Sequence, residues 1–296
     1  GEKMKDKIVL ITGSTGGIGF QTALTLASMN AFVVLHGRSQ ESGAQALLEM
    51  LQKSGNSQGD FISADLSSIS GVRSLSADFQ KRFGRLDVLI HNAGSAADTL
   101  RKTEDGLEFN FAVNAVVPYL LSEMLLKSLK KSKDPRIVTL TGGDLPGKLD
   151  LENLQCEKSF LGLDSYSSSK ITMMCIMKKY SEILEPKGIT CNICYPGYAS
   201  TSMTQNVTKE MLPPSFRFLF PIFQYFVKPD GGKSAQKASR STVYLASSDD
   251  FSKKTGIYCD KNLRIREMPK PVMDENVTNS VWEYLQRVLS VLDVLS

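Results

Sequence analysis

Tyr166 and Lys170, separated by three serines, are the residues of this 296-residue sequence best suited to chemistry. If the segment is helical, residues four apart lie one turn apart on the same face. An ammonium group at that distance stabilises a phenolate and lowers the pKa of the tyrosine. A tyrosine tuned in this way can exchange a proton with a carbonyl or alcohol oxygen near neutral pH. A Tyr and a Lys occur at this spacing often by chance. A catalytic role for the pair is therefore supported only if other motifs of the sequence point to the same chemistry.

A glycine-rich segment far upstream, residues 12–19 (TGSTGGIG), supports a catalytic role for the pair. It follows a short apolar run and opens an amphipathic stretch, which is the strand–turn–helix setting of a dinucleotide-binding turn. Glycines let the backbone approach a pyrophosphate closely, and the start of a helix supplies N–H donors and a partial positive charge. The residues expected to contact the dinucleotide here are Gly13, Ser14, Thr15, Gly17, Ile18 and Gly19.

The end of the second expected strand, Leu35-His-Gly-Arg-Ser39, predicts which dinucleotide binds. Enzymes that use NAD place a carboxylate here, which accepts a hydrogen bond from the ribose 2′-hydroxyl. This segment has no acid, and Arg38, aided by Ser39, can pair with a 2′-phosphate instead. NADP(H) is therefore the predicted cofactor. The alternative is that Arg38 is an ordinary solvated surface residue.

Two further strand ends carry groups that suit the same cofactor. Asp65 and Leu66 could meet the amino group and the ring face of an adenine, although an Asp after a strand is often just a helix N-cap. In the segment His91-Asn-Ala-Gly94, the small Ala93 and Gly94 let the backbone approach a cofactor. Asn92 can brace the neighbouring loop.

These residues need a scaffold that brings several strand ends together. Compact apolar runs alternate with amphipathic stretches, which predicts a parallel sheet with helices on both faces. The expected fold is α/β, a three-layer, doubly wound Rossmann-type sheet in a single domain of residues 1–296. Strands are expected at 7–11, 31–35, 60–63, 86–90, 136–140, 188–194 and 255–258. Helices are expected at 18–29, 43–54, 70–83, 106–130, 165–184, 234–247 and 274–292.

Composition excludes several classes of function. The net charge is +4 and the basic residues are dispersed, so no nucleic-acid-binding surface is expected. The five cysteines follow no disulfide framework, which indicates a reducing compartment, cytoplasmic or organelle-associated. Cys191 and Cys194 lie three apart on an expected strand and so face opposite ways, and no metal site is expected. We see no signal peptide at the start and no apolar run of about 18 residues.

Together, these motifs resemble the short-chain dehydrogenase/reductase family from about residue 5 to residue 258, and within it the retinol-dehydrogenase-like branch. The matching elements, in chain order, are the turn at 12–19, Asp65-Leu66, His91–Gly94, Asn114, Tyr166 with Lys170, and Tyr195-Pro-Gly197 with Thr201. The resemblance implies hydride transfer between a nicotinamide cofactor and a carbonyl or alcohol.

The resemblance also implies a role for each matching residue. Tyr166 is the expected general acid/base, and Lys170 is expected to lower its pKa and hold the nicotinamide ribose. Asn114 is expected to hold a water that links Lys170 to solvent. Pro196 and Gly197 are expected to shape the nicotinamide pocket, with Thr201 bonding the carboxamide.

One position departs from the family pattern. The family ends its fifth strand with a serine that hydrogen-bonds the substrate oxygen. An ungapped reading of the segment that starts at Arg136 puts Gly142 there, whereas a one-residue gap puts Thr141 there, whose hydroxyl could serve. Loss of a donor beside a developing oxyanion typically costs about 10²–10³ in rate.

Residues 198–230, rich in Met, Phe and Pro, fall where the family builds its substrate lid. Such a segment suits an apolar substrate such as a lipid, retinoid or steroid, although it could simply pack on its own core. Residues 212–227 are apolar with a cation near each end. Prolines 213, 214 and 221 interrupt any long helix, so we expect little membrane contact.

Two hypotheses follow. The first is an active carbonyl reductase or alcohol dehydrogenase with a small apolar substrate. The second is a cofactor-binding, catalytically weak relative that acts as a sensor or interaction partner. Many relatives form homodimers through their two long helices, here 106–130 and 165–184, but no residue requires a dimer here.

Overall fold

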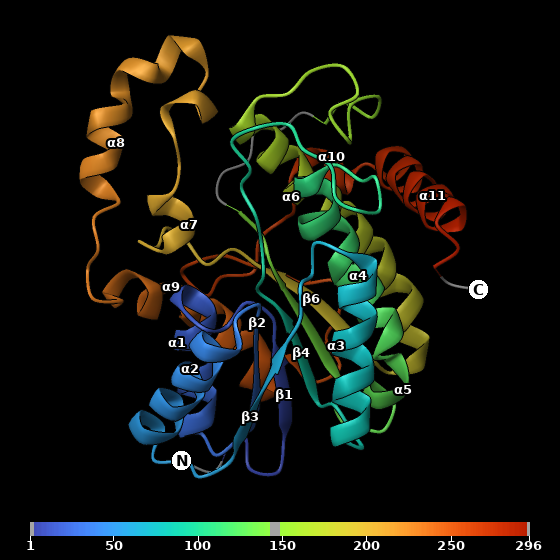
Figure 1. Cartoon of the computed structure of the whole chain (residues 1–296). Coiled ribbons are helices and arrows are strands. Elements are labelled where there is room, and N and C mark those ends of the chain that lie inside the picture. Colours follow the sequence, from blue (N-terminus) through green and yellow to red (C-terminus); the bar gives the residue numbers. More distant parts are fainter. Residues whose placement is uncertain (1–2, 143–148, 295–296) are drawn as a thin grey trace.

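One parallel sheet organises the chain (Figure 1). The structure is a computed structural model that describes residues 3–142 and 149–294. Its strands lie in the order β3-β2-β1-β4-β5-β6-β7, and each neighbouring pair is parallel. They are β1 (Ile8–Ile11), β2 (Phe32–Gly37), β3 (Gly59–Ser63), β4 (Val88–His91), β5 (Arg136–Leu140), β6 (Thr190–Cys194) and β7 (Tyr258–Cys259).

The predicted strands are confirmed, with one shortened. β7 begins only at Tyr258, because Gly256 before it adopts a left-handed φ of +72° that strand backbone does not tolerate. The strand order reverses between β1 and β4, so successive connections leave in opposite directions there. A crevice at the carboxyl ends of the strands is expected at such a reversal.

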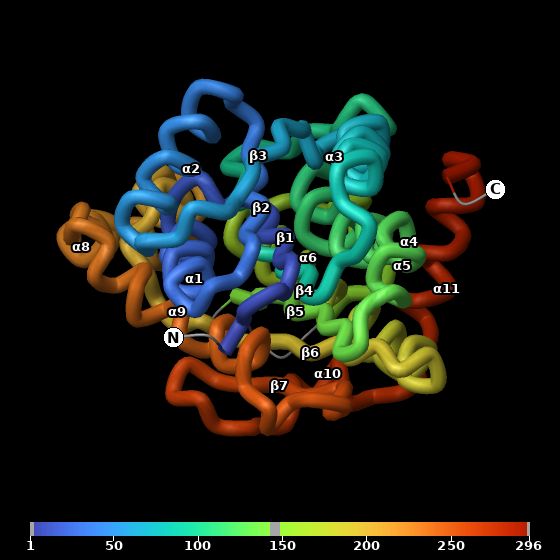
Figure 2. Tube along the Cα trace, turned by 90° about the horizontal axis from the view of Figure 1, so that it is seen from below, coloured from blue at the N-terminus to red at the C-terminus, as the bar shows by residue number. Residues whose placement is uncertain are grey.

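Helices cover both faces of the sheet, as predicted (Figure 2). Helices α1, α2 and α9 pack on one apolar core, and α3, α4, α6 and α11 pack on the other. The helices are α1 (Gly17–Ser28), α2 (Gln40–Ser54), α3 (Ile69–Arg82), α4 (Val117–Met124), α5 (Leu126–Leu129), α6 (Gly162–Leu184), α7 (Ser202–Gln205), α8 (Phe220–Phe226), α9 (Lys233–Ser247), α10 (Lys270–Met273) and α11 (Glu275–Val291). Shorter turns are η1 (Phe111–Val116), η2 (Glu185–Lys187), η3 (Lys209–Met211), η4 (Pro214–Leu219) and η5 (Asp249–Phe251).

The prediction of a single helix at 106–130 is wrong at both ends of that range. Residues 102–108 form a small turn, closed by an antiparallel bridge between Lys102 and Glu108. The helical path then starts as the π-helical turn η1, and Leu125 interrupts it between α4 and α5. π-Helical turns inside helices are frequent at functional sites, and this one contains Asn114.

Helix α11 packs against α4 and α6, which lie within the two segments considered for a homodimer contact. Trp282 packs against Tyr119 of α4 and Tyr180 of α6, with ring centroids 5.2 and 6.4 Å apart. Val281, Leu285 and Leu289 are buried in the same contact. A homodimer through α4 and α6 would therefore have to displace α11.

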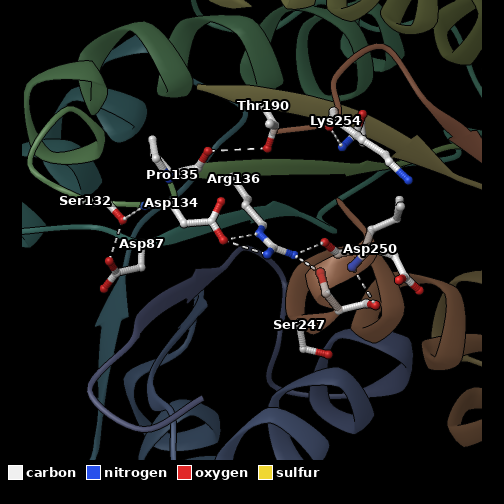
Figure 3. A network of polar contacts seen from close by, with 12 residues as sticks. Asp87, Ser132, Asp134, Pro135, Arg136, Thr190, Ser247, Asp250 and Lys254 are labelled. Atoms are coloured by element: carbon white, nitrogen blue, oxygen red, sulfur yellow. Dashed lines mark hydrogen bonds and ion pairs between the residues drawn. The ribbon is translucent and has the colours of Figure 1, made fainter. Parts of the chain in front are cut away.

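A polar network closes the amino ends of the central strands, opposite the expected site (Figure 3). The buried guanidinium of Arg136 donates to the Asp134 carboxylate at 2.6 Å and to the carbonyl oxygen of Ser248 at 2.7 Å. Asp87 accepts from the Ser132 hydroxyl at 2.6 Å and from the amide of Ile8 at 2.8 Å. These bonds satisfy buried polar groups and hold strand ends together, so we assign the network to the scaffold.

The cysteines lie as predicted. All five are unpaired, and Cys191 and Cys194 belong to the cores on opposite faces of the sheet. Burial raises the pKa of both thiols to about 12. Within the described ranges, no three His, Cys, Asp or Glu residues are grouped to hold a metal ion. No described helix combines the length and hydropathy needed to cross a bilayer.

Candidate active site

Glycine is required at two positions between the end of β1 and the first turn of α1, because a side chain there would clash with residues that follow β4. Gly13 has a φ of +59°, and a Cβ built on it would lie 2.9 Å from the Cα of Ala93. A Cβ on Gly19 would lie 2.4 Å from the side-chain nitrogen of Asn92. The chain ends of β1 and β4 can approach this closely only because these side chains are absent.

Asn92 braces this turn, as predicted. Its side-chain amide donates to the carbonyl oxygens of Thr12 and Gly13, at 3.1 and 2.8 Å. The Thr12 hydroxyl oxygen accepts in return from the amides of Asn92 and Ala93, at 3.1 and 3.0 Å. This reciprocal set fixes the spacing between the two strand ends where a cofactor would cross.

His36, which the sequence did not single out, holds the other side of the turn. Its Nδ1 accepts from the amide of Gly13 at 2.9 Å, and its Nε2 lies 2.9 Å from the carbonyl oxygen of Ala64. Burial lowers its pKa to about 4, so the ring is neutral, with the proton on Nε2 facing the carbonyl. Its position at the end of β2, beside the glycine turn, was the available signal.

A cavity of about 620 Å³ opens at the carboxyl ends of β1 to β4. Residues predicted to bind the cofactor that line it are Gly13, Thr15, Gly17, Ile18, Arg38, Asp65, Leu66, Asn92, Ala93, Gly94 and Thr201. Residues not predicted that also line it are Gly16, His36, Gly37, Ser42, Ser67, Ser95, Arg101, Phe109, Val113, Ser202 and Met203. A Cβ on Gly16 would meet nothing within 4 Å, so the turn leaves open space at this residue.

The remaining predicted cofactor residues are not among those that line this cavity: Ser14, Gly19, Ser39, Tyr166, Lys170, Pro196 and Gly197. The hydroxyl of Ser14 is buried and donates to the carbonyl oxygen of Ile11 at 2.7 Å. Ser39 is the N-cap of α2, where its hydroxyl oxygen accepts from the amide of Ser42. Pro196 follows β6, and a Cβ on Gly197 would lie 3.2 Å from the side chain of Lys261.

Arg38 and Asp65 define one end of the cavity. Asp65 accepts from the amide and hydroxyl of Ser67, and these bonds, with the charge of Arg38, lower the pKa of its carboxyl. The Arg38 side chain is exposed at the cavity wall. Arg101 lines the same cavity, with its guanidinium 3.7 Å from the ring centroid of Phe109. The cavity therefore contains two arginines and suits an anionic ligand.

Lys170 is 6% exposed and lies against the cavity wall. Its Nζ donates to the carbonyl oxygen of Leu140 at 3.3 Å, and a Cβ on Gly94 would lie 3.4 Å from that Nζ. Burial lowers the pKa of Lys170 to about 8. Both residues of the pair lie on α6, as the spacing predicted.

In the protein alone the pKa of Tyr166 is not lowered, and the expectation that Lys170 lowers it stays a prediction. The Lys170 Nζ lies 5.9 Å from the Tyr166 ring centroid, and it points to the Leu140 carbonyl. Burial raises the pKa of Tyr166 to about 12. Desolvation of the phenolate outweighs the attraction of an ammonium that is itself poorly solvated.

Asn114 connects the cavity wall to α6. Its side-chain oxygen accepts from the amide of Ser95 at 2.8 Å, and its nitrogen donates to the Ser95 carbonyl and the Ser169 hydroxyl. The side-chain amide thus holds the loop at Ser95 against α6. The water link to Lys170 stays a prediction.

The neighbourhood of Tyr166 favours the ungapped reading of the fifth strand. A Cβ on Gly142 would lie 2.9 Å from the Tyr166 hydroxyl oxygen, closer than packing normally allows. Thr141 is 4% exposed, and its hydroxyl has no hydrogen-bond partner among the described residues. Gly142, which has no side chain, is therefore the residue that lies against the Tyr166 hydroxyl.

We expect Gly142→Ser to raise carbonyl turnover by about 10-fold or more, because it adds a donor beside the position of a developing oxyanion. The matched control is Gly142→Ala, which adds the same crowding at Tyr166 without a hydroxyl and should lower turnover. Steady-state kinetics of both variants against the native chain provide the test. Equal loss in both would mean that a hydroxyl at 142 does not reach the substrate oxygen.

We expect Lys170→Met to be more stable than the native chain at pH 7, by up to about 3 kcal/mol. The pKa of Lys170 falls from 10.5 to about 8 on folding, so between these values the unfolded chain holds a proton that the folded protein has lost. Native stability therefore rises with pH across this window, and the advantage of the variant should disappear by about pH 10.5.

Urea unfolding at several pH values, followed by the fluorescence of the single tryptophan, Trp282, measures this difference. Lys179→Met, on the same helix, controls for the removal of one positive charge. A stability difference between Lys170→Met and the native chain that stays constant with pH would show that Lys170 is solvated.

The fold and the cavity suit a dinucleotide-binding protein, and comparison with known proteins identifies the family. Residues 7–212 match the short chain dehydrogenase family, and the chain belongs to that family. Within it, the sequence is similar to retinol dehydrogenases. Mouse retinol dehydrogenase 14 is 30% identical, covering 98% of this chain and 87% of the relative. Human retinol dehydrogenase 13 is 30% identical, covering 96% and 85%.

Other relatives extend this likeness. Human dehydrogenase/reductase SDR family member 13 is 29% identical, covering 96% of this chain and 74% of the relative. An uncharacterised protein from Mycobacterium paratuberculosis has the same fold, with a TM-score of 0.75 at 23% identity and coverage of 97% and 94%. A Shigella flexneri short chain dehydrogenase described as complexed with NADP has a TM-score of 0.65 at 21% identity, with coverage of 88% and 99%.

Proposed function

We propose that this chain is an NADP(H)-dependent oxidoreductase that interconverts a carbonyl and an alcohol on a small apolar substrate. The observation that carries the proposal is that Lys170, one turn after Tyr166 on α6, lies against a residue of the cavity wall. Lys170 lies against Gly94, which lines that cavity, and Tyr166 lies against Gly142 at the end of β5. A substrate carbonyl beside Tyr166 would thus also lie beside the cavity.

In the direction of reduction, Tyr166 donates its hydroxyl proton to the substrate oxygen, and in the direction of oxidation it accepts that proton back. Bound NADP(H) would supply or accept the hydride at the carbon atom. Lys170, buried beside Gly94, would hold the nicotinamide ribose and return a proton to Tyr166. With its pKa near 8, the lysine can both hold and release a proton close to neutral pH.

The charge at the end of β2 supports NADP(H) over NAD. An NAD site needs a carboxylate for the ribose 2′-hydroxyl. Between Leu35 and Ser42 the acid is Glu41, in the first turn of α2, whereas Arg38 and Ser42 line the cavity. A guanidinium beside a hydroxyl matches a 2′-phosphate in charge and in hydrogen bonding.

We propose that residues 198–230 form the substrate lid. Thr201, the N-cap of α7, and Ser202 and Met203, the first residues of α7, already line the cavity. The Thr201 hydroxyl also caps α7, so the proposed bond to the carboxamide would use a residue whose backbone is fixed. The apolar character of the segment favours an apolar substrate, such as a retinoid, a lipid aldehyde or a steroid.

The second candidate is a cofactor-binding protein with weak catalysis, acting as a sensor or interaction partner. The observation that favours it is Gly142, since no hydroxyl on that residue can assist Tyr166 at the substrate oxygen. Of the two candidates, we favour the enzyme, because loss of one donor lowers the rate without removing the acid/base pair.

The experiment that separates the two measures NADPH binding and NADPH oxidation on the same preparation. The carbonyl panel contains retinaldehyde, a medium-chain aldehyde, a steroid ketone and a short polar aldehyde as the contrast. We expect turnover with the apolar carbonyls and little with the polar one. Tight NADPH binding without turnover of any carbonyl would overturn the enzyme and support the sensor.

A further inference from the structure

Two asparagines at η1 are hydrogen-bonded to two serines of α6 in matching register. Asn110, the N-cap of η1, and Asn114, within η1, lie four residues apart, as do the serines. The Asn110 amide nitrogen donates to the Ser165 hydroxyl at 3.0 Å. The Asn114 amide nitrogen donates to the Ser169 hydroxyl at 2.9 Å. None of the four side chains is more than 6% exposed, so these two buried contacts, here called the amide brace, join η1 to α6.

Each serine of the amide brace comes directly before a residue of the proposed acid/base pair. Ser165 precedes Tyr166, and Ser169 precedes Lys170. The Ser169 hydroxyl also donates to the carbonyl oxygen of Tyr166 at 2.6 Å. The Ser165 hydroxyl also donates to a carboxylate oxygen of Glu108 at 3.4 Å. Because each hydroxyl both donates and accepts, its orientation is fixed from two sides.

The oxygen atoms of the two side-chain amides hold a loop of the cavity wall. The Asn110 oxygen accepts from the Ser95 hydroxyl and from the amide of Ala97, both at 3.0 Å. The Asn114 oxygen accepts from the amide of Ser95 at 2.8 Å. Ser95 itself lines the dinucleotide cavity. Each asparagine therefore connects the cavity wall to α6 through its own side chain.

The first turn of α6 has no side-chain cap of its own. Its N-cap residue is Leu161, whose side chain offers no acceptor to the free amides of the turn. Helix ends without such support fray, unless contacts from other elements fix them. Ser165 lies in this turn, and its bond to Asn110 is such a contact.

The position of the Tyr166 hydroxyl depends on this turn, because Tyr166 follows Ser165 directly. The hydroxyl oxygen lies so close to Gly142 that a Cβ there would be 2.9 Å away. A misplacement of about 1 Å at a reacting group can cost about 10²-fold in rate. The amide brace thus differs from the network around Arg136, which holds the opposite ends of the strands.

We propose that Asn110 is a positioning residue for Tyr166, and that the amide brace couples occupation of the dinucleotide cavity to the order of the first turns of α6. A dinucleotide packed against Ser95 restrains the loop, and the two asparagines transmit that restraint to Ser165 and Ser169. The kinetic consequence rests on the proposed function, whereas the coupling requires no turnover.

Hydrogen–deuterium exchange of the α6 amides at 163–170, with and without NADPH, tests the coupling. We expect NADPH to slow this exchange about 10-fold or more in the native chain. Ser165→Ala should exchange about 10-fold faster than the native chain without NADPH, since it loses a buried hydrogen bond, and NADPH should slow it by only about twofold. The matched control is Ser167→Ala, in the same part of α6, whose hydroxyl has no hydrogen-bond partner among the described residues. It should exchange like the native chain.

Steady-state carbonyl reduction, beside a titration of NADPH binding, tests the positioning role. Ser165→Ala and Asn110→Ala should each lower kcat about 10-fold or more and leave the carbonyl KM within about twofold of the native value. The double variant should lose no more than the weaker single variant, because the two side chains act as one unit. Trp282 fluorescence, from a ring packed against Tyr119, confirms that each variant is folded.

The proposal is overturned if NADPH slows exchange equally in Ser165→Ala and in the native chain. Rate losses that add in the double variant also overturn it, as does a carbonyl KM that rises while kcat stays at the native value. Absence of turnover in the native chain would count against the proposed function alone, and the exchange measurements would still decide whether the cavity and α6 are coupled.

Discussion

Tyr166→Phe should lower kcat for carbonyl reduction by about 10²–10⁴-fold while leaving NADPH affinity within about twofold of the native value. The substitution removes one hydroxyl and keeps the ring, so packing against Gly142 is preserved. Because burial raises the pKa of Tyr166 to about 12, the hydroxyl is protonated in the protein alone and is ready to donate. No ring carbon can replace that proton.

Single-turnover measurement of NADPH oxidation, beside a fluorescence titration of NADPH binding, separates chemistry from affinity. The matched control is Tyr244→Phe, which removes a hydroxyl that donates to the Asp250 carboxylate, outside the cavity lining and outside the proposed lid. That control should retain turnover. Unchanged turnover in Tyr166→Phe would mean that another group protonates the substrate, and a parallel loss of NADPH affinity would assign Tyr166 a structural role.

Arg38→Asp should weaken NADPH binding by about 10²–10³-fold and strengthen NADH binding. Removal of a charge-assisted hydrogen bond costs about 1.5–3 kcal/mol, and a carboxylate in its place repels the 2′-phosphate. The same carboxylate can accept from the 2′-hydroxyl of NADH. The substitution is on an exposed side chain, so folding should be unaffected.

The control for this prediction is the other arginine of the cavity. Arg101→Asp removes an equal charge from the same cavity but from the residue stacked on Phe109. Fluorescence titrations with NADPH and NADH on both variants give the preference ratio. A reversed ratio in Arg101→Asp together with a native ratio in Arg38→Asp would make Arg101 the phosphate ligand.

Much of the fold was predictable because its signals are local. The compact apolar runs predicted all the strands, since a strand buried on both faces must be apolar throughout. The glycine turn was equally clear, because Gly13 and Gly19 leave space for Ala93 and Asn92. By contrast, the path of residues 102–116 was misread, because a bridge between Lys102 and Glu108 and a π-helical turn depend on contacts that periodicity does not record.

For the Tyr166–Lys170 pair too, one property follows from the sequence and another depends on the tertiary structure. Residue spacing alone put both side chains on one helix, since four residues make about one turn. The protonation of the pair was decided by tertiary structure, because burial raises the pKa of Tyr166 and lowers that of Lys170. Likewise, packing determines that Gly142 meets the tyrosine hydroxyl and that apolar side chains between residues 216 and 226 stay exposed. Desolvation and exposure depend on which distant segments meet, and no local pattern of residues encodes that.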